Sequence, residues 1–195
     1  MSNTLSVKEC LKTGWQLFKA RPWFYVGITL LVTVIQMVIS GLQAATPEPI
    51  ATLISFVFST LLYAGILNFY LRAHEGAGKV GDLWNPKPFW SYLGVSLLLL
   101  LIVGIGFLLL IVPGLILAMM FFFAGYLVVD RGLNPIAALK ESYRLTKGNR
   151  WKLFLLTLAV AGLAILGMIP LLLGLLIVVP VTGLASVHAY RTLSR

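Results

Sequence analysis

Long apolar segments alternate with shorter polar ones along this chain. Apolar runs that approach the roughly 20 residues needed to cross a bilayer lie at 23–43, 50–71, 89–112, 114–129, 151–169 and 171–190. The fourth run is short, and the boundary between the fifth and the sixth is hard to place. The pattern predicts an all-α, polytopic membrane protein with six transmembrane helices.

Composition supports this prediction. Of the 195 residues, 59% are hydrophobic and 11% are charged, whereas soluble domains have about 45–50% and 25%. A soluble protein with one ordinary core is therefore excluded. A cleaved signal peptide is disfavoured, because the first apolar run is too long and no small-residue cleavage site follows it. We treat residues 1–195 as a single membrane domain.

Basic residues mark one side of the predicted protein. Lys and Arg near the ends of spans favour the cytoplasmic face. With six spans, every basic group lands on that face, so both termini are predicted to be cytoplasmic in a bacterial inner membrane. The opposite face carries one charge, Glu48. The 15 basic residues are Lys8, Lys12, Lys19 and Arg21; Arg72, Lys79 and Lys87; Arg131, Lys140, Arg144, Lys147, Arg150 and Lys152; Arg191 and Arg195.

The sequence also repeats itself. "WFYVGITLLV" at 23–32 is similar to "WSYLGVSLLL" at 90–99, and residues 11–32 align without gaps with "LKESYRLTKGNRWKLFLLTLAV" at 139–160. Each copy begins a unit that enters at a Trp, crosses, turns at a proline and returns. We predict three hairpin repeats, approximately 1–72, 73–130 and 131–195, arranged in parallel about an axis along the membrane normal.

Two segments predict amphipathic helices at the cytoplasmic surface. Ser6 and Glu9 form a capping-box pattern before the first, and Asn134 with Pro135 can begin the second. Such helices lie flat at the headgroups with their apolar face down. The predicted apolar contacts are Val7, Leu11, Trp15, Phe18, Ile136, Leu139 and Tyr143, and the predicted lipid-contact residues are Lys8, Lys12, Lys19, Lys140, Arg144 and Lys147.

Two stretches near the C-terminus resemble a known family. They are "PGLILAMMFFFAGYLVVDRGLNPIAALKESYRLTKGNRWKLF" and "PVTGLASVHAYRTL". They resemble the uncharacterised YciC-like bacterial inner-membrane proteins and the related membrane domain of some glycerophosphodiester phosphodiesterases. The resemblance covers roughly residues 80–195 well and the first repeat loosely. It implies an all-helical membrane domain and supplies no catalytic residue, and the soluble catalytic barrel of the phosphodiesterases is absent from this sequence.

The sequence contains little that points to catalysis or metal binding. His74 and His188 are the two histidines and Cys10 is the one cysteine, too few for a cluster with metal-ligand spacing. At the end of the fourth run we expect a local turn or an ion pair between Asp130 and Arg131. We therefore expect no catalytic residue, no metal ligand, no cofactor and, despite a net charge of +9, no nucleic-acid partner.

Function is predicted from what the spans lack. Their middles carry no charged residue, whereas ion-coupled transporters usually keep ionisable groups there. Gln36, Gln43 and Asn68 predict hydrogen bonds between helices. These features favour a non-enzymatic membrane module that binds or organises anionic membrane lipids or partner proteins. A transporter or channel for a small or lipid-like solute is the alternative, and a membrane-protein partner or a homo-oligomer stays open.

Cysteine labelling in sealed cells tests the predicted topology. A membrane-impermeant thiol reagent added outside should label Glu48→Cys, because that connection is predicted to face outward. It should not label Lys79→Cys or Arg144→Cys, which are predicted to face the cytoplasm. Permeabilised cells, in which all three sites become accessible, are the control. Labelling of Lys79→Cys in intact cells would contradict the topology.

Overall fold

Every regular element in the described part of the chain is a helix. The computed structural model describes residues 5–44, 48–84, 89–168 and 174–194. The side chains of Gln43, Glu48, Lys87 and Arg195 lie outside the described residues. The elements are α1 (Val7–Ala20), α2 (Pro22–Ala44), α3 (Glu48–His74), the 3₁₀ helix η1 (Val80–Trp84), α4 (Phe89–Leu109), α5 (Ile111–Met120), α6 (Ala124–Arg131), α7 (Pro135–Thr146), α8 (Arg150–Met168) and α9 (Leu175–Ser194).

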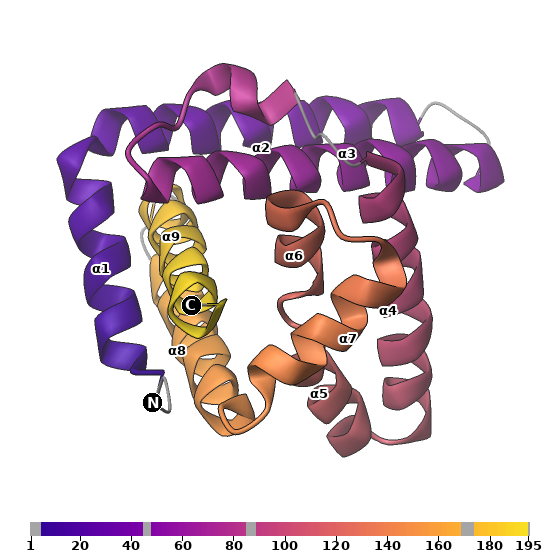
Figure 1. The fold of residues 1–195 in the computed structure, drawn as a ribbon. Helices are drawn as coiled ribbons and strands as arrows, with labels where there is room; N and C mark the ends of the chain where they lie inside the picture. The colour runs from indigo at the N-terminus through magenta and orange to yellow at the C-terminus, as the bar shows by residue number, and fades with distance from the viewer. Residues whose placement is uncertain (1–4, 45–47, 85–88, 169–173, 195) are drawn as a thin grey trace.

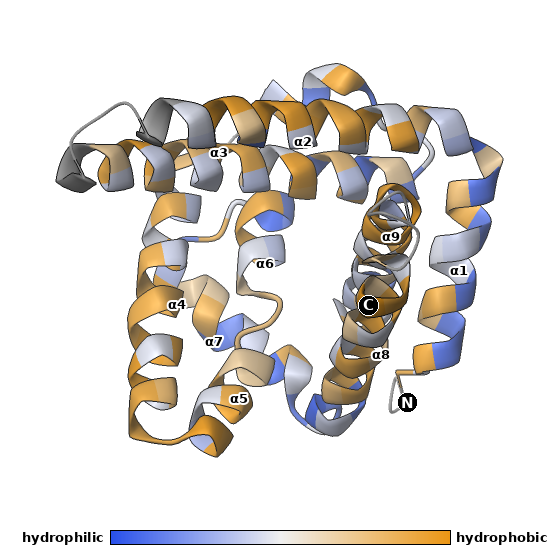
Figure 2. Ribbon diagram, turned by 180° about the vertical axis from the view of Figure 1, so that it is seen from behind, coloured by the Kyte–Doolittle hydropathy of each residue, from blue (hydrophilic) through white to orange (hydrophobic). Residues whose placement is uncertain are grey.

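Six helical stretches within the described residues are long and apolar enough to cross a membrane, as predicted. They bear exposed large apolar side chains such as Met37, Leu108 and Ile165, and Figure 2 shows hydrophobic residues along their lengths. Monomeric soluble proteins rarely expose apolar patches beyond a few hundred Å², so this surface fits a lipid environment. The six stretches are Pro22–Gly41, Ala51–His74, Phe89–Leu109, Ile111–Arg131, Arg150–Met168 and Leu175–Ser194.

Candidate spans that follow one another in the chain contact each other in three pairs, α2 with α3, α4 with α5, and α8 with α9, and α9 also packs against α2 and α3. The pairs point in different directions: in Figure 1, α2 and α3 lie across the top, α4 descends on the right, and α8 and α9 are seen obliquely. The N-terminal helix α1 lies along α9. This pairing is compatible with hairpins, and their origin as three repeats stays a prediction.

Glycine pairs allow two of these helix pairs to approach closely near their turns. A Cβ atom on Gly106 of α4 would lie 2.9 Å from the Cα atom of Gly114 in α5. A Cβ atom on Gly174 would lie 2.7 Å from the Cα atom of Gly167 in α8. Small residues let helix backbones approach closely, so a side chain at any of these positions would push the paired helices apart.

The fourth span is interrupted, which differs from the continuous helix predicted over 114–129. α5 ends at Met120 and α6 begins at Ala124. A neighbouring helix, α7, supplies hydrogen bonds at this break through two fully buried side chains, Ser142 and Thr146. The Ser142 hydroxyl accepts from the Phe123 N–H at 3.2 Å and donates to the Met120 carbonyl at 3.1 Å.

The Thr146 hydroxyl lies 3.0 Å from the same Met120 carbonyl and can donate to it. In an apolar environment an unpaired backbone group is costly, and broken membrane helices persist where neighbouring side chains re-satisfy those groups. The two hydroxyls therefore stabilise the break and hold α7 against it.

Aromatic side chains fill the region where α3, α6 and α9 meet. Phe69, Phe123 and Tyr190 are fully buried. The ring centroids of Phe123 and Tyr190 lie 5.7 Å apart, a separation typical of favourable aromatic pairs. Asn68 of α3, for which we predicted a hydrogen bond between helices, donates to the Asp82 carbonyl of η1 at 3.1 Å. The described centre is therefore a packed core.

Substitution of Ser142 tests the role of α7 at the break. Ser142→Ala leaves the Phe123 N–H without its acceptor in an apolar setting, so it should lower the free energy of unfolding by about 1–3 kcal/mol. Ser40→Ala is the matched control, because the exposed Ser40 hydroxyl donates to the Gln36 carbonyl of its own helix. Thermal unfolding in detergent measures both variants. Equal melting temperatures for the two would contradict this role of Ser142.

Candidate functional site: an exposed basic surface

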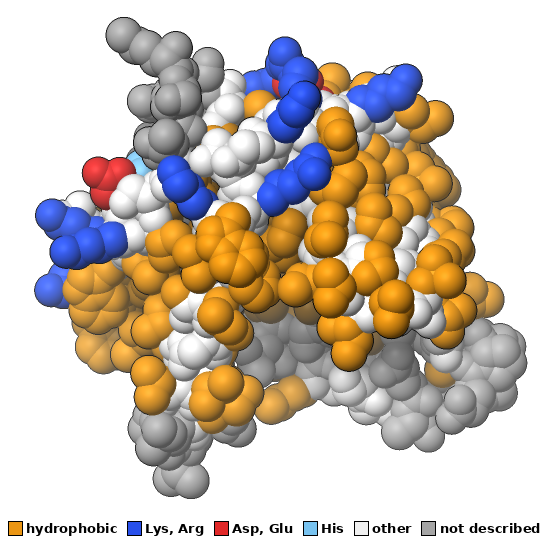
Figure 3. Space-filling view, turned by 90° about the horizontal axis from the view of Figure 1, so that it is seen from below, with side chains coloured by type: hydrophobic (Ala, Val, Ile, Leu, Met, Phe, Trp, Pro, Cys, Tyr) orange, Lys and Arg blue, Asp and Glu red, His pale blue; other side chains and the backbone are white. Residues whose placement is uncertain are grey.

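The basic segments of the chain lie on one side of the molecule and contact one another. The Leu5 N–H donates to Oδ1 of Asn149 at 3.3 Å, which joins the N-terminal segment to the loop before α8. The Arg131 guanidinium donates to the Ser194 carbonyl at 3.0 Å, which joins α6 to the end of α9. Figure 3 shows Lys and Arg side chains gathered along part of this face, with hydrophobic side chains over the remainder.

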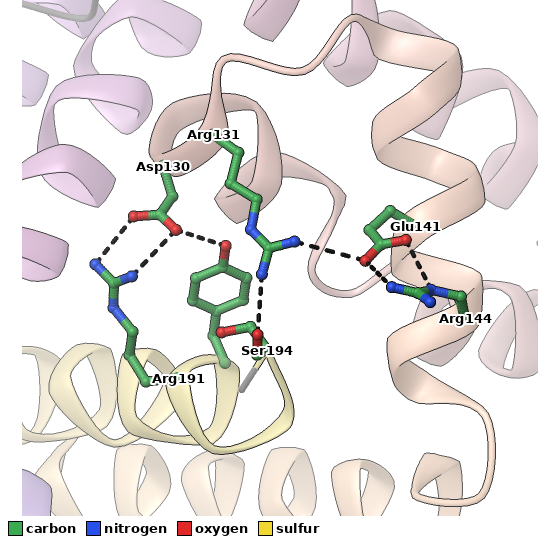
Figure 4. Close-up of polar contacts among 7 residues, drawn as sticks. Asp130, Arg131, Glu141, Arg144, Arg191 and Ser194 are labelled. Carbon is green, nitrogen blue, oxygen red and sulfur yellow. Dashed lines mark hydrogen bonds and ion pairs between the residues drawn. The ribbon is translucent and has the colours of Figure 1, made fainter.

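Asp130, at the end of α6, organises the interior of this region (Figure 4). Its carboxylate accepts from the Tyr190 hydroxyl at 2.7 Å and from Nη1 of Arg191 at 3.1 Å. Nη2 of Arg191 lies 2.9 Å from the other Asp130 oxygen and 2.6 Å from Glu75 at the end of α3. Arg191 therefore ties α3, α6 and α9 together. We expected a local turn or an ion pair with Arg131 at this position, and the ion pair of Asp130 forms with Arg191 instead.

A second ionic group joins α6 to α7. Nη1 of Arg131 lies 3.6 Å from Glu141, and Arg144 contacts both Glu141 oxygens, at 2.9 and 2.7 Å. The hydrogen bonds and charge of Arg144 hold the pKa of Glu141 below its usual range. Arg144, which we predicted to contact lipid phosphate, thus has a carboxylate partner within the chain, although its side chain is 75% exposed.

Lysines and arginines differ in the ion pairs that they form. Every ion pair among the described residues involves an arginine, namely Arg72, Arg131, Arg144 or Arg191. The predicted lipid-contact lysines are all exposed, and none has a carboxylate partner in the described part of the chain. They are Lys8, Lys12, Lys19, Lys140 and Lys147. These lysines therefore leave a set of uncompensated positive charges on the surface of α1 and α7.

The inner face of α1 is packed against protein. The Ser6 oxygen accepts from the Glu9 N–H as the predicted N-cap, at 3.4 Å. Cys10, Gly14 and Phe18 are buried, and a Cβ atom on Gly14 would lie 2.5 Å from the Val181 carbonyl oxygen of α9. Phe18, which we expected to face lipid, therefore packs inward. Burial raises the pKa of the Cys10 thiol to about 11, which lowers its reactivity at neutral pH.

The helix α7 also has one buried face and one exposed face. Asn134 caps the helix by accepting from the Ala137 N–H at 2.8 Å, as predicted. Of the predicted apolar contacts, Ile136 and Tyr143 are exposed while Leu139 is buried. The buried face also carries Ser142 and Thr146, which our sequence reasoning missed. The spacing in the sequence could have indicated this polar face, because a Ser and a Thr four residues apart lie on one face of a helix.

Arg150, at the start of α8, was not among the predicted site residues. Its guanidinium lies 4.7 Å from the centroid of the Tyr143 ring, a cation–π contact. Its buried Nε and Nη2 atoms have no hydrogen-bond partner among the described residues. The contact links α8 to the exposed face of α7, next to the basic surface.

The two histidines lie together although the sequence separates them by 114 positions. Nε2 of His74 and Nδ1 of His188 are 3.2 Å apart, so one ring can donate a hydrogen bond to the other. Their contact joins the end of α3 to α9, close to the pair between Glu75 and Arg191. No group of three His, Cys, Asp or Glu side chains in the described residues is arranged to hold a metal ion.

Comparison with known proteins assigns the chain to a family. The model of the family described as "Protein of unknown function (DUF975)" matches residues 91–195. The chain belongs to this family. It is similar to the uncharacterized protein Rv2560 of Mycobacterium tuberculosis and the uncharacterized protein Mb2590 of Mycobacterium bovis, with 32% identity over 157 residues in each case. The match covers 76% of this chain and 48% of each relative.

This member of the family thus spans about half the length of the curated relatives it matches. No solved structure matches the chain. The comparisons agree with the expected resemblance at the level of an uncharacterised family, and they assign no activity to any residue of the site.

Replacement of Asp130 tests the interior network. Asp130→Asn keeps the shape of the side chain but removes the charge that Arg191 contacts, so it should lower the free energy of unfolding by about 1.5–3 kcal/mol. Arg144→Gln is the comparison, because its pair with Glu141 is exposed and such pairs contribute little. Thermal unfolding in detergent should show a clear loss for the first variant and almost none for the second. A larger loss of thermal stability in Arg144→Gln than in Asp130→Asn would contradict the role of Asp130 in joining the helices.

Proposed function

We propose that this chain is a non-enzymatic membrane module that binds and organises anionic lipid at the cytoplasmic face of a bacterial inner membrane. The observation that carries the proposal is the set of exposed lysines on α1 and α7 that have no carboxylate partner within the described residues. In this arrangement both termini are cytoplasmic, and the outer faces of α1 and α7 lie at the headgroups. The resemblance to YciC-like inner-membrane proteins supports the same location.

The difference between lysine and arginine gives the proposal its physical basis. Arginine has a planar fork that suits fixed bidentate pairs with carboxylates, whereas lysine is a hydrated point charge on a flexible stem. Each basic residue near an anionic membrane surface contributes about 1 kcal/mol, within a screening length of about 8–10 Å. The three lysines of α1 therefore supply roughly 3 kcal/mol of attraction, enough to enrich anionic lipid beside the protein.

The packed centre supports the module over the alternative of transport. Phe69, Phe123 and Tyr190 fill the region between α3, α6 and α9, so a solute path there would require these rings to move. The interruption of the fourth span does not by itself favour transport. Transporters use broken helices to present backbone groups to a substrate, but here Ser142 and Thr146 bind the Met120 carbonyl.

Charge removal on the exposed lysines tests the proposal. Lys8, Lys12, Lys19, Lys140 and Lys147 are replaced together by Gln, and co-purifying lipids are measured by native mass spectrometry. Anionic lipid should fall severalfold relative to zwitterionic lipid, because the attraction of five charges is lost. The apparent melting temperature should stay close to that of the wild type, since the described structure shows no ion pair for these lysines.

Two matched controls separate lysine charge from other effects. Replacing the same five residues by Arg retains their charge and should retain the lipid. The double variant Glu141→Gln and Arg144→Gln removes an exposed intramolecular ion pair without changing the net charge, and it should also leave lipid retention unchanged. If the five-Gln variant kept its anionic lipid, these lysines would serve topology alone and the proposal would be wrong.

A further inference from the structure

A groove lies between α4 and the first two turns of α7. Its volume is about 590 Å³, within the range of about 300–1,000 Å³ that is usual for small-molecule sites. Because Ile136 and Lys140 are exposed, the groove opens to the surface. It is lined by Gly94, Leu98, Asn134, Pro135, Ile136, Ala137 and Lys140.

Small residues create this groove. A Cβ atom on Gly94 would lie 2.9 Å from Cγ of Pro135, so the proline ring rests directly on the backbone of α4. Ala137, which also lines the groove, adds only a methyl group. The cap at Asn134 fixes the start of α7 in this position. The shape of the groove therefore follows from the contact between Gly94 and Pro135.

The α4 residues that line the groove, Gly94 and Leu98, follow a residue type that is common at the membrane interface. Trp90, Gly94 and Leu98 are spaced by four residues and lie on one face of the helix. Trp90 is 79% exposed, and Trp side chains are enriched at the level of the headgroups. Leu98 lies about 12 Å further along the helix, from a rise of 1.5 Å per residue. The wall formed by α4 thus runs from the interface toward the acyl region.

Lys140 is the only ionisable side chain among the described residues that line the groove. Lys140 has no carboxylate partner among the described residues, because the adjacent Glu141 is engaged by Arg131 and Arg144. A groove that is apolar along one wall and carries one positive charge complements an amphiphile with an acyl tail and an anionic head. Within a membrane, a phospholipid has this chemistry.

We infer that this groove holds one anionic phospholipid, with an acyl chain against Gly94 and Leu98 and its phosphate beside Lys140. The inference rests on the proposed function and goes beyond it, because it distinguishes one specifically bound lipid from the general enrichment of anionic lipid around the basic surface. Ala137 and Lys140 have separate roles: the small side chain leaves room for the tail, and the charge selects the head.

Titration of the purified 195-residue chain with defined lipids tests the site. Native mass spectrometry should detect one phosphatidylglycerol molecule that binds more tightly than the rest. Ala137→Leu fills the groove and should weaken this binding at least tenfold. Ala161→Leu adds the same side chain to an exposed position of α8 and should leave the binding unchanged.

Charge reversal provides a second test that does not depend on the packing of α7. Lys140→Glu, at an exposed position, should reduce the preference for phosphatidylglycerol over phosphatidylethanolamine by about fivefold or more, the factor that corresponds to ~1 kcal/mol. Lys79→Glu makes the same change at an exposed residue outside the groove and should preserve the preference.

The outcomes separate this inference from the proposed function. If Ala137→Leu and Lys140→Glu both retain the tight lipid while the five-Gln variant loses anionic lipid, the groove is not the site and the proposed function stands. If neither groove variant nor the five-Gln variant changes lipid binding, both are wrong. Loss of the tight lipid in Ala161→Leu or Lys79→Glu to the same extent as in the groove variants would also overturn the groove assignment.

Discussion

Hydrogen bonding of the backbone in an apolar setting is the constraint on which this architecture depends. The fourth span breaks between Met120 and Ala124, and an unpaired carbonyl or N–H there would be costly. Ser142 and Thr146 of α7 supply the missing partners. Because these hydroxyls are one helical turn apart, they fix both the position and the rotation of α7. The break and α7 therefore depend on each other.

That rotation determines what the rest of α7 can do. With Ser142 and Thr146 turned inward, Glu141 is placed between Arg131 and Arg144, and Lys140 is left exposed beside α4. One short helix thus supplies hydrogen bonds at the break in a span, takes part in an ionic network and forms one wall of a groove. These roles are compatible because they use side chains on different faces of the helix. The helix has 12 residues, Pro135–Thr146, so more than three turns are available along its length.

The charged residues show a division between internal cohesion and external contact. Asp130 and Arg191 join three helices at the basic side of the molecule, where a carboxylate that bridges a guanidinium and a buried tyrosine is geometrically specific. The lysines are outside this network. The chain has 6 acidic residues against 15 basic ones, and four of the acidic residues, Glu75, Asp82, Asp130 and Glu141, form ion pairs with arginines. The excess positive charge is then available at the surface.

Sequence alone predicted the all-helical class, six helices long and apolar enough to cross a membrane, and the two N-caps, because hydropathy and capping depend on residues close together in the chain. It did not reveal the break at Phe121–Phe123, whose run of aromatic residues is as apolar as its flanks. The partner of Asp130 was also missed, since Arg191 lies 61 positions away. The contact between His74 and His188 and the burial of one face of α1 were also missed. Only the tertiary structure decided these, because they depend on which helices pack together, and long apolar helices such as α3 and α4 have apolar residues on several faces.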